Sequence, residues 1–286
     1  MKKIKIILIL CISIIFLSGC EKVNLDNAKI YTTIYPIQYI TESLYKDNGT
    51  IESIYPAGVN LEEYTLTSKQ IDNYSQGDLF VYIGLSKERE LAKSFVNNNH
   101  DLLIIDATYG LSSNNIEELW LAPNNFLMLA KNVKNSFCEY LDNSIKEEEI
   151  TKAYDKLYEQ VSWLDAELRN IAKDAKESGN NTIVIAYNSL KFLENYGFNV
   201  VSIEDIEESG SQNAIVDLKS RFKSGAYTNI LKLDTESNTE LVNELISSNK
   251  ASVLQLDSLI TNNDTSSDYV TIQYENIAII RDLLLK

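Results

Sequence analysis

The stretch SIKEEEITKAYDKLYEQVSWLDAELRNIAKDAKESG, from Ser144 to Gly179, has the clearest helical pattern in the sequence. Ser144 and Glu147 form the S-x-x-E pattern of a capping box, and Gly179 is a typical helix stop. A helix of about thirty residues is about 45 Å long, which exceeds the width of one α/β lobe. Apolar residues recur along it at helical spacing, namely Ile150, Tyr154, Leu157, Val161, Leu164, Leu168 and Ile171.

This helix has two interpretations, a coiled coil that joins two chains or a rigid connector within one chain. Its apolar stripe is a single stretch, and segments with alternating strand and helix patterns lie on both sides of it. We therefore favour a connecting helix over residues 144–178, packed along two lobes, and we expect a monomer.

Short apolar runs rich in β-branched residues flank this helix, four on each side. Stretches of helical spacing separate them, as in βα units on a parallel sheet. The sequence therefore predicts an α/β fold with two lobes, 30–143 and 179–286, each with a four-stranded, mainly parallel sheet and with a cleft between them. The runs are Ile30–Ile34, Thr50–Tyr55, Leu79–Ile83 and Leu102–Ile105, then Thr182–Ile185, Val200–Ile203, Asn229–Leu233 and Val253–Leu256.

The first twenty residues have the pattern of a lipoprotein signal. Three lysines at positions 2, 3 and 5 precede an apolar run over 6–16, and Leu17-Ser18-Gly19-Cys20 closes it as a lipobox. We expect residues 1–19 to be removed and Cys20 to carry acyl chains, each buried CH₂ contributing ~0.8 kcal/mol. With 20–29 as a tether, the protein is expected on the extracytoplasmic face of the cell membrane, and a Gram-positive surface and a periplasm fit equally well.

Composition excludes several function classes. The formal charge of −15 becomes −18 once three signal-peptide lysines are removed, so we expect no nucleic-acid partner. Cys138 is then the one cysteine besides Cys20, which leaves no disulfide within the mature chain. His100 lies in a polar run, and no sequence motif of nucleophilic, zinc-protease or nucleotide chemistry is present. We therefore predict that the protein is not an enzyme.

Six segments in order and in register resemble the metal-binding solute receptors of ABC importers. These are zinc and manganese lipoproteins, some of them called adhesins. The segments are Tyr31–Pro36, Pro56–Tyr64, Leu79–Leu85, Leu119–Asn125, the Tyr196-Gly197 pair, and Asp268-Tyr269 followed by Asn276. The resemblance implies two α/β lobes on one rigid helix, which agrees with the pattern above, and an ABC permease as the partner that receives the cargo.

The metal ligands that the resemblance implies are changed in this chain. The histidine of the family pattern P-x-G-x-x-x-H falls at Glu62, and that of H-x-W-x-x-P falls at Glu118. The third ligand, a His or Glu, falls at Ala186, which has no donor atom, and the acid near the C-terminal helix falls at Ser267 or Asp268. No histidine is present at these positions.

Two readings of the cleft are open. Glu62, Glu118 and Asp268 would form an oxygen site that suits Mn²⁺, Ca²⁺ or Mg²⁺ better than Zn²⁺. Alternatively, the chain is a degenerate receptor that has lost metal binding and acts in cell adhesion, as a surface interaction module, or binds another small solute. Further cleft-lining candidates are Glu63, Glu117, Asp234 and Tyr187.

Overall fold

The computed structural model describes residues 23–45, 48–59, 61, 63–249, 251–262 and 266–285. The predicted signal peptide, Cys20 and Glu62 lie outside these ranges. The first lobe contains a four-stranded parallel sheet in the order β2-β1-β3-β4. Its strands are β1 (Ala28–Thr32), β2 (Gly49–Ser53), β3 (Leu79–Tyr82) and β4 (Leu103–Asp106).

The second lobe repeats this topology. Its four strands are also parallel and lie in the order β6-β5-β7-β8. The prediction of two four-stranded sheets in an α/β fold is confirmed. The strands are β5 (Thr182–Ile185), β6 (Asn199–Ser202), β7 (Asn229–Leu233) and β8 (Ser252–Leu256).

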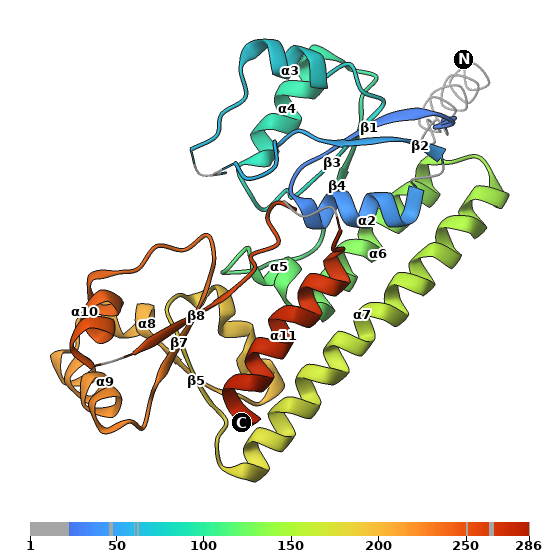
Figure 1. Cartoon of the computed structure of the whole chain (residues 1–286). Coiled ribbons are helices and arrows are strands. Elements are labelled where there is room, and N and C mark those ends of the chain that lie inside the picture. The colour runs from blue at the N-terminus through green and yellow to red at the C-terminus, as the bar shows by residue number, and fades with distance from the viewer. Residues whose placement is uncertain are drawn as a thin grey trace, which may run out of the picture.

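Helices cover the sheets and join the lobes (Figure 1). Those of the first half are α2 (Tyr35–Tyr45), α3 (Ser68–Tyr74), α4 (Glu88–Asn98), α5 (Glu118–Leu121) and α6 (Pro123–Tyr140). Those of the second half are the 3₁₀ segment η2 (Asn188–Tyr196), α8 (Ile203–Glu208), α9 (Gln212–Ser224), α10 (Glu240–Asn249) and α11 (Tyr269–Leu285). None of the helices in the described part of the chain is both long and apolar enough to cross a membrane.

The long helix α7 (Ser144–Ser178) runs along both lobes, with α11 beside it (Figure 1). Every apolar position of its predicted stripe except the half-buried Tyr154 is buried. The helix ends at Gly179, whose φ of 76° is left-handed, as expected of a glycine stop. The predicted capping box is wrong, because Asn143 is the N-cap and its side chain accepts from the backbone N–H groups of Ile145 and Lys146.

The two lobes share one apolar core. It extends from the first sheet through α6, α7 and α11 to one face of the second sheet, and a smaller core lies between the other face and α9 and α10. At the junction, the ring of Tyr269 stacks on Phe126 with ring centroids 3.9 Å apart. The hydroxyl of Tyr269 donates to the carbonyl oxygen of Trp120. A shared core of this kind favours small tilts over wide opening of the lobes.

Glu88, at the start of α4, is a buried carboxyl group in the first lobe. It is 4% exposed, and its Oε2 accepts from the backbone N–H of Ile83 at 2.9 Å. Burial raises its pKa from 4.5 to about 7, against the smaller opposing effect of this hydrogen bond. The native state therefore binds a proton between these pH values that the unfolded chain releases.

Because the native state binds this proton, the unfolding free energy should depend on pH. Because the pKa is raised on folding, the contribution of Glu88 is fully present below pH 4.5 and is lost as the pH rises to about 7. We expect wild-type protein to lose roughly 3 kcal/mol of unfolding free energy across this window from this group, and Glu88→Gln to abolish that loss. Urea unfolding at several pH values measures it. The control, Glu90→Gln on the exposed side of α4, should leave the pH slope unchanged, and an unchanged slope in Glu88→Gln would contradict the prediction.

Candidate functional site

The loops at the carboxyl ends of both sheets meet between the lobes. The backbone N–H of Tyr35, after β1, donates to the carbonyl of Ile260, after β8, at 2.9 Å. On the other side, the side chain of Asn115 donates to the carbonyl of Asn188 at 3.0 Å. In parallel α/β sheets, ligands bind outside the carboxyl ends of the strands. This boundary is therefore the place to look for a site.

Two acids follow the last strands of the second lobe directly. Asp234 comes after β7 and Asp257 after β8. Asp234 accepts from the backbone N–H of Ser258 at 3.0 Å, and Asp257 accepts from that of Leu259 at 2.7 Å. Burial raises the pKa of Asp257, and the nearby carboxylate of Asp234 raises it further. Asp257 is half-buried and Asp234 is exposed, and a cation would stabilise the two neighbouring carboxylates.

A third acid, Glu236, lies in the same loop as Asp234. It accepts from the hydroxyl of Ser189 and from the backbone N–H of Leu233, the latter at 2.7 Å. Burial raises the pKa of Glu236, and the carboxylate of Glu117, which precedes α5, adds to this by repulsion. Glu117, predicted as a cleft residue, therefore acts on the second lobe from the other side of the boundary.

The other predicted residues lie in different surroundings. Glu118, at the start of α5, is half-buried and its carboxylate accepts from Ser113 at 3.3 Å. Glu63 is exposed. Ala186 is fully buried after β5 and offers no side-chain donor. The hydroxyl of Tyr187 donates to the carbonyl of Ser237 at 2.7 Å.

Asp268 and Ser267 line a pocket of about 630 Å³ beside α2. Its lining includes Tyr35 and Ile260 of the lobe boundary but not Glu118. Asp268 caps α11, because its Oδ1 accepts from the backbone N–H and the hydroxyl of Thr271 at 2.8 and 2.7 Å. Glu62 lies outside the described residues, and the convergence of Glu62, Glu118 and Asp268 on one site stays a prediction.

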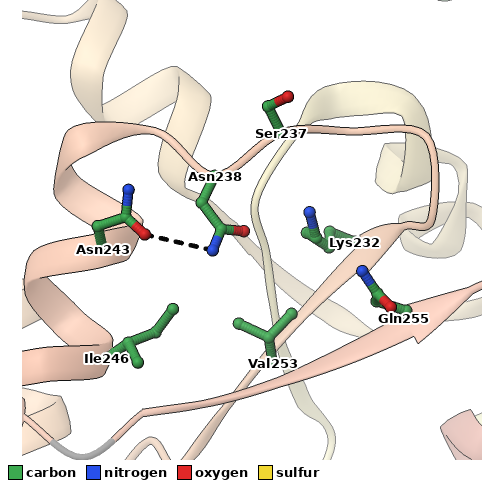
Figure 2. A pocket seen from close by; sticks show the side chains of 7 residues that line it. All are labelled: Lys232, Ser237, Asn238, Asn243, Ile246, Val253 and Gln255. Atoms are coloured by element: carbon green, nitrogen blue, oxygen red, sulfur yellow. Dashed lines mark hydrogen bonds between the residues drawn. The ribbon is translucent and has the colours of Figure 1, made fainter.

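Another hollow, of about 610 Å³, lies in the second lobe between α10 and strands β7 and β8 (Figure 2). Lys232, which is 5% exposed, donates to the carbonyl of Glu236, and Asn238 donates to the side chain of Asn243 at 3.3 Å. This lining has a lysine and no carboxylate, so it does not suit a cation. Its residues are Lys232, Ser237, Asn238, Asn243, Ile246, Val253 and Gln255.

The donor chemistry near the boundary is that of oxygen. His100 is exposed after α4, where its ring Nδ1 lies 2.8 Å from the carbonyl oxygen of Val96, and Cys138 lies on α6. Over the described residues, no three His, Cys, Asp or Glu side chains form a group that could hold a metal ion. The acids are instead arranged as the pair Asp234 and Asp257 and as Glu236 opposite Glu117.

The sequence also matches a known family over most of its length. Residues 30–283 fit the model of ZnuA, described as zinc-uptake complex component A, periplasmic. The chain belongs to the ZnuA family. The expected resemblance to metal-type solute receptors is thereby confirmed.

The individual relatives share low sequence identity with this protein. It is 23% identical to the zinc-binding lipoprotein AdcA of Streptococcus pneumoniae, over 98% of this chain but 61% of AdcA. It is 26% identical to the manganese ABC transporter substrate-binding lipoprotein PsaA of Streptococcus mitis, over 84% of each chain. The crystal structure of the metal-dependent lipoprotein YcdH of Bacillus subtilis matches it with a TM-score of 0.72 and 22% identity, over 90% of this chain and 99% of YcdH.

Sequence reasoning missed Asp257 and Glu236. Its position in the sequence could have indicated Asp257 as a site residue, because it is an acid directly after the apolar run that forms β8. The sequence indicated Glu236 less clearly, since it lies in a polar loop of several exposed residues. Its burial depends on contacts with Ser189, which is distant in sequence.

Proposed function

We propose that the chain is the solute-binding lipoprotein of a metal-type ABC importer, and that the acids at the lobe boundary receive its cargo. Membership of the ZnuA family and the relatives named as zinc- or manganese-binding lipoproteins support this role. Held by acyl chains on Cys20 at the extracytoplasmic face, with residues 20–29 as a tether between the anchor and the first lobe, the protein would pass its cargo to a permease as a monomer.

The observation that carries the proposal is the pair Asp234 and Asp257 at the carboxyl ends of β7 and β8. Both carboxylates are held by backbone N–H groups, and burial together with mutual repulsion raises the pKa of Asp257. A divalent cation relieves that repulsion, because it interacts favourably with both negative charges at once. Glu118 and Glu62 are the proposed donors from the first lobe.

We propose a hard divalent cation such as Mn²⁺ or Ca²⁺ as the cargo. Zinc sites in proteins are built chiefly from cysteine and histidine, whereas carboxylate and carbonyl oxygens suit Mn²⁺, Ca²⁺ and Mg²⁺. Every acidic donor named at this boundary supplies oxygen. We therefore expect Zn²⁺ to have no advantage over Mn²⁺ here.

Thermal unfolding of the chelator-treated full chain tests this proposal. At one hundred times its dissociation constant, Mn²⁺ should add about 2.7 kcal/mol to the unfolding free energy. The substitution Asp257→Asn should abolish most of this gain, because it removes a charge and keeps the shape. Glu159→Gln, an exposed acid on α7, is the matched control and should keep the full gain. If Mn²⁺ stabilised Asp257→Asn as much as the wild-type chain, Asp257 would not be a ligand of the cation.

A second candidate function is a receptor that has lost metal binding and acts in surface interactions or on another solute. It is favoured by the absence, over the described residues, of any three gathered metal-donor side chains. This candidate predicts no gain in melting temperature with Mn²⁺, Ca²⁺, Mg²⁺ or Zn²⁺ in the same experiment.

A further inference from the structure

The pocket that contains Asp268 lies at the lobe boundary, since Tyr35 and Ile260 line it, but it contains none of the acids Asp234, Asp257, Glu117 or Glu118. We call it the tyrosine pocket. Three tyrosines form much of it, and two acids and several neutral polar groups complete it, with no lysine or arginine among the lining residues. Its principal residues are Tyr35, Tyr39, Tyr55, Gln38, Glu42 and Asp268.

Neighbouring contacts fix the aromatic walls. Tyr39 stacks on the fully buried Tyr269 with centroids 5.5 Å apart, and its ring lies 6.1 Å from that of Tyr35 at an angle of 53°. Tyr55 is 6% exposed. Burial raises the pKa of Tyr35 to about 12, and the carboxylates of Asp268 and Glu42 add to this. The phenols are therefore neutral at physiological pH, and their rings are held in place before any ligand arrives.

Neutral groups hold the two carboxylates. Glu42 accepts from the amide of Gln38 at 2.8 Å, and Asp268 accepts from Thr271. Burial raises the pKa of Tyr39, and the nearby carboxylate of Asp268 adds to this. Within the described ranges, neither acid forms an ion pair. The lining thus has two negative charges that no basic side chain in it balances.

We infer that the tyrosine pocket binds a small organic cation with an ammonium group, which lies against the tyrosine rings and pairs with Asp268 and Glu42. Aromatic faces attract such cations, and quaternary ammonium groups are typically held in aromatic cages. The volume of about 630 Å³ falls in the range of small-molecule sites and far exceeds that of a bare ion.

This inference does not depend on the proposed metal cargo, because the tyrosine pocket contains none of Asp234, Asp257, Glu117 or Glu118. The two can fail separately. Choline binding should persist in the presence of EDTA, whereas any Mn²⁺ effect should vanish there. Loss of choline binding on addition of EDTA would overturn the inference, because it would make the cation site depend on a metal.

Isothermal titration calorimetry of the full chain in a nonionic detergent tests it, with choline as the probe. The uncharged compound of the same shape, 3,3-dimethylbutan-1-ol, should bind at least about tenfold more weakly, because it lacks the charge. Asp268→Asn should weaken choline binding by a similar factor while keeping an oxygen that can cap α11. Tyr35→Leu should also weaken it, and Glu159→Gln should not.

Three results would overturn the inference. One is the absence of heat from choline with protein that unfolds normally. Another is equal affinity for choline and the uncharged compound, because the pocket would then recognise shape alone. The third is unchanged choline affinity in both Asp268→Asn and Tyr35→Leu, which would place the ligand outside the tyrosine pocket.

Discussion

Replacing Tyr269 with alanine should lower the free energy of unfolding by about 3–5 kcal/mol. The ring is fully buried where the lobes meet and stacks on Phe126 and Tyr39, so its removal leaves a cavity between α6, α11 and α2. It also removes the hydrogen bond to the carbonyl of Trp120. Urea unfolding followed by circular dichroism measures the change.

Two control variants separate these contributions. Tyr269→Phe keeps the stacked ring and loses only the hydroxyl, so we expect the free energy of unfolding to fall by about 1–3 kcal/mol. Tyr274→Ala changes an exposed tyrosine on the same helix and should shift stability by no more than about 0.5 kcal/mol. An equal loss in Tyr269→Ala and Tyr274→Ala would contradict the role of Tyr269 in joining the lobes.

Replacing Cys20 with alanine should move the protein from the membrane fraction to the soluble fraction. Two acyl chains give stable anchoring, since each buried CH₂ contributes ~0.8 kcal/mol, whereas one chain binds only marginally. Removal of the modified cysteine removes both chains at once. Fractionation of cells followed by immunoblotting measures the distribution.

Cys138→Ala is the matched control for the anchor. Cys138 lies on α6 and is partly exposed, so it is a second site at which acylation could be sought. Its replacement should leave the protein in the membrane fraction. If Cys20→Ala stays in the membrane fraction, the anchor is not at Cys20. Release of Cys138→Ala in the same experiment would place the anchor at Cys138 instead.

The fold was largely predictable because its signals are local. Each of the eight predicted apolar runs became a strand with bounds within two residues of those observed, and the helix over 144–178 has the same ends. Its cap was misassigned because Asn143 and Ser144 both favour N-caps. Only the backbone of Asn143, with φ of −147° and ψ of 100°, shows which of them precedes the first helical residue.

The site was less predictable because it depends on contacts between distant segments. Asp268 caps α11 and lines the tyrosine pocket, a role that its spacing in the sequence did not indicate, while its convergence with Glu62 and Glu118 stays a prediction. Asp257 gains its raised pKa from burial and from Asp234, which is twenty-three residues away in sequence and directly follows the neighbouring strand. Spacing in a single sequence does not reveal which acids share such an environment.

The metal content of the protein tests the receptor assignment. The chelator-treated full chain is dialysed against Mn²⁺, Ca²⁺ or Zn²⁺ and then against buffer, and bound metal is measured by mass spectrometry. We predict about one Mn²⁺ or Ca²⁺ per chain, no preference for Zn²⁺, and loss of the bound ion in Asp257→Asn. Retention of no divalent ion by the wild-type chain would contradict the account.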